Sequence, residues 1–229
     1  MDIEKNVFLL PFAGGSSLTY NQWQLGHFRF HRIDYSGHGF RYQEPAAQSM
    51  EGLVNDVIQQ IEGVHPARFS LFGHSMGGLL AWLAAQKLEK KPQSLFISAC
   101  EPPGCLDAGK YGKYQREDLL MQYISDYNRM PEKQRDSKVF RKILLPVIQN
   151  DFRVLSEYVY EPAPVLDVPI VVLYSREDTM MRYEVMGEWK DYGRDVRFRE
   201  LGGDHFYLEE ERNRDRILET MNEIMTNEG

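Results

Sequence analysis

The sequence predicts an α/β fold with a mostly parallel central sheet that is flanked by helices on both faces. Short apolar runs, which are typical of buried strands, recur along the chain, and segments with apolar residues at helical spacing separate several of them. This alternation is typical of parallel sheets, which carry their functional residues at the carboxyl ends of the strands. With 229 residues, of which 42% are apolar and 27% charged, we expect one globular domain over residues 1–229.

Six runs are expected to form strands, at residues 7–10, 28–33, 69–72, 95–99, 169–174 and 196–201. Three segments carry the apolar spacing of helices, at residues 50–61, 79–88 and 217–225. The interval from about 101 to 160 interrupts the alternation, because it holds no predicted strand and has helical stripes at 119–127 and 139–147. We expect this insertion to be a helical lid over the site, although ordinary core helices have the same stripes.

Composition excludes several classes of function. The net charge of −7, from 27 basic and 34 acidic residues, argues against a nucleic-acid partner. No apolar run approaches the roughly 18 residues that span a bilayer, and the charged residues 1–5 do not resemble a signal peptide. Cys100 and Cys105 lack the spacing of metal or redox motifs. We therefore expect a cytoplasmic protein with no metal and no membrane partner.

The most informative segment is Gly73-His74-Ser75-Met76-Gly77, between a predicted strand and a predicted helix. A G-x-S-x-G in this context holds its serine in a tight, strained turn, with the hydroxyl above the edge of the sheet. A side chain at either flanking glycine would collide with the neighbouring strand or helix. The motif predicts that Ser75 is a nucleophile, but it occurs by chance about once in ten to fifteen proteins of this length. The prediction therefore depends on whether a suitable base and acid follow later in the chain.

A serine nucleophile needs a histidine as base and usually an acid that orients the histidine. His205 directly follows the last predicted strand and is the expected base. The acid is expected after the strand at 169–174, where Asp178 is preferred and Glu177 is the alternative. Asp204 is disfavoured because it adjoins His205. The chain order of serine, acid and histidine is that of the α/β-hydrolases.

The other five histidines are weaker candidates. His74 adjoins the nucleophile, and we expect its side chain to pack structurally. His38 is in a loop at the strand ends, where it either lines the site or packs within the loop. His27 and His31 are four residues apart, but the segment between them is predicted to be a strand and not a helix, so they are not expected to bind metal; His65 is in a surface connection.

Tetrahedral intermediates of acyl transfer need two N–H donors for the developing oxyanion. We expect one donor to be the backbone N–H of Met76, which follows the nucleophile. The other is expected from Phe12 or Ala13 in the loop at 11–16, where paired glycines allow close approach. A glycine-rich anion cradle is the alternative for this loop, but no nucleotide-binding motif follows it.

Five segments together resemble the type II thioesterases of nonribosomal peptide and polyketide synthesis. They match in order and at suitable spacing, from about residue 6 to about residue 220. The segments are Pro11-Phe12-Ala13-Gly14-Gly15-Ser16, Gly37-His38-Gly39 with Glu44-Pro45, Gly73-His74-Ser75-Met76-Gly77-Gly78, Leu145-Pro146 with Asp151-Phe152, and Gly202-Gly203-Asp204-His205-Phe206.

The resemblance implies an α/β-hydrolase with a helical lid, acting on acyl or aminoacyl groups held on the phosphopantetheine arm of carrier proteins. By this resemblance, the catalytic triad of the family corresponds to Ser75, Asp178 and His205, and its oxyanion donors correspond to Met76 and the Phe12 to Ala13 segment. No cofactor is implied. The chain departs from the family in the loop Ser36-Gly37-His38-Gly39 and at Ser175, where a Gly-x-x-Asp pattern is usual.

The implied reaction is attack of Ser75 on the thioester carbonyl, with His205 as base, followed by hydrolysis of the acyl-serine. Activity is then expected to rise with pH near the histidine reference of about 6.5. A small carboxylesterase or lipase with the same triad is one alternative, and a non-catalytic binding protein is another.

We expect the protein to be a monomer and to bind acidic carrier proteins. Because the protein is itself acidic, docking requires a local basic patch. The candidates are Lys110, Lys113 and Arg116, or Lys87, Lys90 and Lys91.

Overall fold

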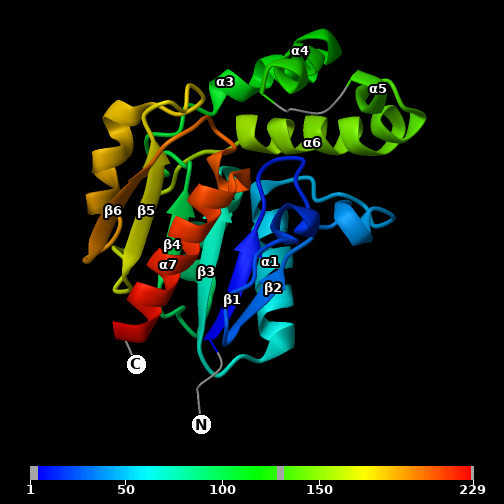
Figure 1. The fold of residues 1–229 in the computed structure, drawn as a ribbon. Helices are drawn as coiled ribbons and strands as arrows, with labels where there is room; N and C mark the ends of the chain where they lie inside the picture. The colour runs from blue at the N-terminus through cyan, green and yellow to red at the C-terminus, as the bar shows by residue number, and fades with distance from the viewer. Residues whose placement is uncertain (1–4, 128–131, 228–229) are drawn as a thin grey trace.

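The computed structural model describes residues 5–127 and 132–227, and a six-stranded sheet forms its centre (Figure 1). The strand order is β2-β1-β3-β4-β5-β6, and every pair of neighbours runs parallel. The predicted α/β fold is therefore confirmed. All six predicted strands form, as β1 (Lys5–Leu10), β2 (Phe28–Arg32), β3 (Phe69–His74), β4 (Leu95–Ser98), β5 (Ile170–Ser175) and β6 (Val196–Leu201).

Helices cover both faces of the sheet. In β1, Phe8 and Leu10 belong to the core on the side of the helices at 50–64 and 76–87, whereas Val7 and Leu9 belong to the core on the side of the helix at 211–227. Successive side chains of a strand point to opposite faces, so a strand that is covered on both sides forms a continuous apolar run. The three predicted helices are α1 (Met50–Val64), α2 (Met76–Lys87) and α7 (Glu211–Asn227).

The described part of the helical insertion, residues 101–127 and 132–160, lies above the carboxyl ends of the strands (Figure 1). Both predicted stripes are helical. The first lies in α4 (Glu117–Tyr127), and the second is divided between a π-helical segment (Phe140–Leu144) and α6 (Leu145–Ser156). Pro146 explains this division, because it lacks the N–H that would continue an α-helical ladder, and the turn before it widens.

The insertion is joined internally by aromatic side chains around Phe152 of α6. The ring of Phe152 stacks on Tyr111 at 5.7 Å between centroids, and it contacts Tyr114 at 4.7 Å and Tyr123 at 5.1 Å. These three tyrosines come from separate helical elements, so one side chain holds the helices of the insertion together. Phe152 is buried.

The remaining helical elements are short and occupy connections. They are α3 (Gly109–Gly112), α5 (Glu132–Arg135) and 3-10 turns at Ser17–Tyr20, Gly39–Arg41, Lys113–Gln115, Tyr183–Asp191 and Tyr207–Glu209. Within residues 5–127 and 132–227, no helix has the length and apolar character needed to cross a membrane.

Candidate active site

Ser75 occupies the turn between β3 and α2, at the carboxyl edge of the sheet. Its φ of 56° and ψ of −119° lie in a region that side chains rarely adopt, which is the strain expected of this motif. A Cβ atom at Gly73 would collide with the carbonyl oxygen of Gly77, and one at Gly77 would collide with that of Leu10. The predicted need for glycine at both flanks is confirmed. Ser75 itself is half-buried.

His205 and Asp178 meet in a buried contact at the same edge. The Nδ1 atom of His205 lies 2.7 Å from Oδ2 of Asp178, and the backbone N–H of Met180 donates to the other carboxylate oxygen at 2.9 Å. The hydroxyl of Ser175 donates to the carbonyl of Gly203 at 2.6 Å and so joins the two loops that carry the pair. Serine in place of the family's usual glycine therefore has a structural role here.

The two other acids near this contact are placed differently. Glu177, the alternative acid, has an exposed side chain. Asp204 accepts a hydrogen bond from the backbone N–H of Phe206 at 2.9 Å and caps its own turn. Asp178 is therefore the acid that the fold brings to His205.

His74 supports the loop of His205, in agreement with the predicted structural role. Its Nε2 atom lies 2.8 Å from the carbonyl oxygen of His205, and its Nδ1 lies 2.9 Å from the hydroxyl of Ser98. Burial holds the pKa of His74 well below its usual value, so the ring is neutral. A carbonyl can only accept, so we assign the ring proton to Nε2.

The loop at 11–16 is fixed from several sides. The hydroxyl of Tyr20 donates to the carbonyl of Leu10 at 2.8 Å, and the hydroxyl of Tyr35 donates to that of Pro11 at 2.7 Å. The ring of Phe12 packs edge-on against Phe206, with 4.9 Å between centroids. The loop that holds the candidate oxyanion donors is thereby placed beside the loop of His205.

A second buried histidine–aspartate pair links this loop to the helical insertion. The Nε2 atom of His38 lies 2.8 Å from Oδ2 of Asp151 in α6, and the backbone N–H of Gly14 donates to the same oxygen at 2.6 Å. The Nδ1 atom of His38 faces the carbonyl of Ser36 at 3.1 Å. Since both ring nitrogens face acceptors, the ring is suited to carry two protons and a positive charge.

The electrostatics of this pair agree with that assignment. Burial pulls the pKa of His38 down, but the hydrogen bond and negative charge of Asp151 outweigh burial, and the pKa is raised. The second carboxylate oxygen of Asp151 is buried without a hydrogen-bond partner. From the sequence, His38 is expected either to line the site or to pack within its loop, and its pairing with Asp151 is not predicted. The only signal was that both residues lie in segments that carry the family resemblance.

The space beside Ser75 is small and has a charged wall. Its volume is about 10 Å³, and its lining includes Leu79, Glu101 and Leu155. Burial raises the pKa of Glu101, but hydrogen bonds and charge from Arg182 and Lys110 hold that pKa below its usual value. Their nitrogens lie 3.0 Å and 3.1 Å from its carboxylate. The carboxylate is therefore charged and paired within the wall.

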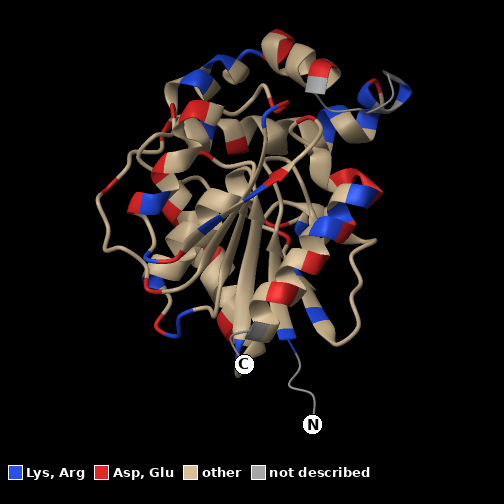
Figure 2. Cartoon of the chain, turned by 60° about the vertical axis from the view of Figure 1, so that its left-hand side comes forward, with Lys and Arg blue, Asp and Glu red and all other residues tan. Residues whose placement is uncertain are grey.

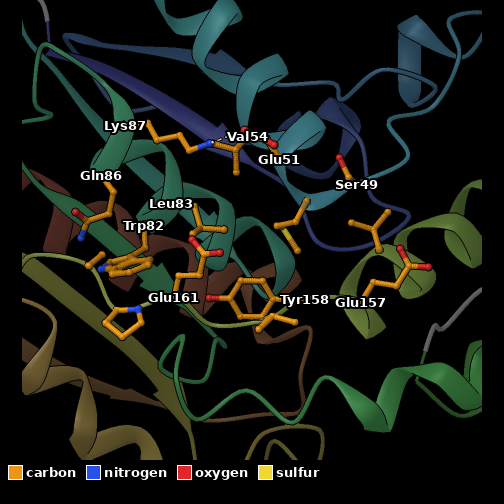
Figure 3. Close-up of a pocket in the computed structure, with 15 residues that line it drawn as sticks. Ser49, Glu51, Val54, Trp82, Leu83, Gln86, Lys87, Glu157, Tyr158 and Glu161 are labelled. Atoms are coloured by element: carbon orange, nitrogen blue, oxygen red, sulfur yellow. Dashed lines mark hydrogen bonds and ion pairs between the residues drawn. The ribbon is translucent and has the colours of Figure 1, made fainter.

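A larger groove of about 480 Å³ lies elsewhere, between α1, α2 and the chain that follows α6 (Figure 3). Trp82 and Tyr158 form part of its wall, and Glu51 and Lys87 form an ion pair of 3.3 Å at its rim. The triad candidates do not line this groove. In the part of the chain that the structure describes, no cluster of three or more His, Cys, Asp or Glu side chains is arranged to hold a metal ion.

The sequence of the chain matches a known protein family. The model of the thioesterase domain family matches residues 5–225. The chain belongs to this family. The resemblance carried by the five sequence segments is thereby confirmed, and the protein is a thioester hydrolase.

Similar proteins include thioesterases of biosynthetic pathways. Thioesterase TesA of Mycobacterium marinum is 29% identical over 211 residues, which are 88% of this chain and 84% of TesA. The gramicidin S biosynthesis protein GrsT of Aneurinibacillus migulanus is 26% identical, over 89% of this chain and 83% of GrsT. The RedJ thioesterase of the prodiginine pathway in Streptomyces coelicolor superposes with a TM-score of 0.86 at 27% identity, covering 97% of this chain and 91% of RedJ.

Proposed function

We propose that this thioesterase hydrolyses acyl or aminoacyl thioesters on the phosphopantetheine arm of carrier proteins in nonribosomal peptide or polyketide synthesis. The observation that carries the proposal is the buried 2.7 Å contact of His205 with Asp178, at the sheet edge where Ser75 occupies its strained turn. GrsT, which is named as a gramicidin S biosynthesis protein, and RedJ, which is named as a thioesterase of the prodiginine biosynthetic pathway, support the choice of a biosynthetic substrate. Removal of misloaded groups from carriers is the corresponding role in the cell.

The chemistry follows from the properties of the three side chains. The carboxylate of Asp178 accepts a hydrogen bond from Nδ1–H of His205, which keeps the proton on Nδ1 and leaves Nε2 as the basic nitrogen. His205 takes the hydroxyl proton as the oxygen of Ser75 attacks the thioester carbonyl, and it passes that proton to the departing carrier thiol. A water molecule then attacks the acyl-serine by the same route, which releases the acid and restores the hydroxyl.

The tetrahedral intermediates require donors for their negatively charged oxygen. The N–H of Met76 begins α2, where the helix dipole adds to its effect. The second donor in this proposal is the N–H of Ala13 or Phe12, in the loop that two tyrosine hydroxyls and Asp151 hold in place.

The test compares three substrates with the same acyl group: an acyl-loaded carrier domain, an N-acetylcysteamine thioester and a simple ethyl ester. We expect the highest kcat/KM on the loaded carrier and loss of all three activities in Ser75→Ala. Release of the free acid is followed by mass spectrometry. A preference for the ethyl ester would make the protein an esterase and contradict the carrier proposal, and activity retained by Ser75→Ala would contradict the mechanism.

A further inference from the structure

Five large apolar side chains are exposed around a single hollow on the surface. They make up five of the nine exposed large apolar residues among those described, and we call them the apolar rim: Leu18, Phe40, Tyr42, Val139 and Leu144. Phe40 is 82% exposed. Exposed apolar groups that gather in one place are typical of interaction sites, whereas scattered ones need no explanation.

The hollow lies against the active-site loop. It has a volume of about 330 Å³, and its lining includes Gly14, Gly15 and His38 together with Ile143 and Val147 of the insertion. Its surface is therefore shared between the loop after β1 and the helical insertion. A group that enters it lies beside the segment that holds the candidate oxyanion donors.

Two turns that contribute to the apolar rim are held in place by one buried carboxylate. Asp34 accepts hydrogen bonds from the backbone N–H of Ser17 at 2.6 Å and from that of Phe40 at 3.0 Å. The turns that carry Leu18 and Phe40 are thus tied to the same side chain. A preorganised surface loses less conformational entropy when it binds a partner, which favours a role in binding.

Positive charge borders the apolar rim. Residues 133–144 contain five basic side chains and one acidic side chain, although the whole protein has a net charge of −7; of the five, Arg141 is paired with Asp136 and Glu117. Figure 2 shows Lys and Arg positions gathered in the part of the insertion at the upper right of the view. Lys138 and Lys142 are exposed and stand one helical turn apart, beside the stripe that carries Val139 and Ile143.

The basic groups considered in the sequence analysis are already engaged within the protein. Lys110 pairs with Glu101, and Arg116 pairs with Asp118 at 2.6 Å. The amino group of Lys91 donates to two carbonyls at the end of α2. These contacts favour a docking surface elsewhere.

We propose that the apolar rim, with Lys138 and Lys142, is the surface on which an acidic carrier domain docks. This inference rests on the proposed function. The two lysines face acidic side chains of the carrier domain, and Phe40 and Val139 contact its apolar side chains. The hollow receives the phosphopantetheine arm of the carrier. Along α6, Val147 at the hollow and Leu155 beside Ser75 are separated by about 12 Å, at 1.5 Å per residue. An extended phosphopantetheine arm covers that distance, so the folded carrier domain does not need to enter the hollow.

The test uses an acetylated carrier domain and acetyl-N-acetylcysteamine, which offers the same bond without a carrier. We expect Phe40→Ser and the double variant Lys138→Glu with Lys142→Glu each to lower kcat/KM on the carrier by about tenfold or more. Activity on the small thioester is expected to stay within about twofold of the wild type, because the exposed side chains are changed and not the triad. That retained activity also reports that each variant is folded.

Two matched controls lie outside the apolar rim. Val159→Ser changes a valine that is 78% exposed, and the double variant Lys87→Glu with Lys90→Glu reverses the other lysine group considered from the sequence. Both are expected to keep wild-type activity on both substrates. If the control lysines and not Lys138 and Lys142 lower carrier turnover, docking takes place at the other surface.

The possible failures can be told apart. A wild-type protein that hydrolyses the small thioester but not any of a panel of carriers contradicts the proposed function and this inference with it. Wild-type turnover of a carrier that persists unchanged in the Phe40 and Lys138/Lys142 variants overturns the docking surface alone. Light scattering of the same variants covers a third case: if they convert a dimer to monomers, the apolar rim is a contact between two copies, and the docking proposal is wrong.

Discussion

At the scale of single residues, two buried histidine–aspartate pairs lie close to one edge of the sheet, and their surroundings separate their roles. His205 and Asp178 lie in the loops that follow β6 and β5, and the ring of His74 contacts the backbone carbonyl of His205. His38 with Asp151 instead binds a backbone N–H of the loop after β1. We therefore propose that the first pair acts in proton transfer and that the second positions the loop.

Adjacent acidic residues provide a matched test of the first assignment. Asp178→Asn is expected to lower kcat by roughly 10³- to 10⁴-fold, because an amide there no longer fixes the histidine tautomer. Glu177→Gln is expected to remain within about twofold, because the Glu177 side chain is exposed. Steady-state kinetics on an N-acetylcysteamine thioester measure both. A larger loss in Glu177→Gln than in Asp178→Asn would reverse the assignment of the acid.

At the scale of elements, the contact between α6 and the loop at 11–16 determines how the insertion meets the site. The carboxylate of Asp151 reaches from α6 to Gly14, and Ile148 of α6 fills the space where a side chain at position 14 would lie. The insertion is thus joined to the loop by a charged contact as well as by apolar packing. The charged part depends on the protonation of His38.

The raised pKa of His38 predicts how stability changes with pH. A histidine whose folded pKa lies above its unfolded value of about 6.5 stabilises the fold fully below that value and loses this effect as pH rises through the folded pKa. We therefore expect His38→Gln to lower the melting temperature more at pH 5.5 than at pH 9. Thermal unfolding followed by circular dichroism measures this difference.

The negative charges near His38 define the control for that experiment. Asp151 and Asp34 both raise the pKa of His38, and Asp151→Asn should therefore remove most of the pH-dependent difference between wild type and His38→Gln. A difference in melting temperature that is the same at both pH values would show that the pair does not carry a charge.

At the scale of the whole molecule, charge is distributed unevenly. The protein has a net charge of −7, yet residues 133–144 carry an excess of basic side chains next to the apolar rim. An acidic partner is repelled by the protein as a whole and attracted by this segment. Which effect dominates at contact distance can be measured, because salt screens both.

We expect kcat/KM on a loaded carrier to fall as salt rises from about 0.05 to 0.5 M. At contact distance, the attraction between the basic segment and the acidic carrier exceeds the repulsion between the two net charges, and salt weakens this attraction. Turnover of the small thioester is expected to stay nearly constant over the same range. The Lys138 and Lys142 double variant serves as the control and should lose the salt dependence. An increase of carrier turnover with salt would mean that repulsion dominates, and it would argue against a basic docking surface.

Much of the architecture could be predicted because its signals are local. Apolar runs marked all six strands, and apolar spacing marked α1, α2 and α7. The division of the second stripe of the insertion into a π-helical segment and α6 was not foreseen, although Pro146 was visible in the sequence. A proline indicates that a helix is disturbed there, but packing decides whether the helix ends or widens.

The sequence by itself determined the order of strands and helices, the strained turn at Ser75 and the positions of Asp178 and His205 at strand ends. Those features depend on side-chain spacing and turn chemistry within a few residues. Only the tertiary structure decided that His38 meets Asp151, 113 positions away, and that Leu18, Phe40 and Val139 surround one hollow. Such partners are chosen by how elements pack in space, and the pattern of one segment contains no information about the distant segment it will contact.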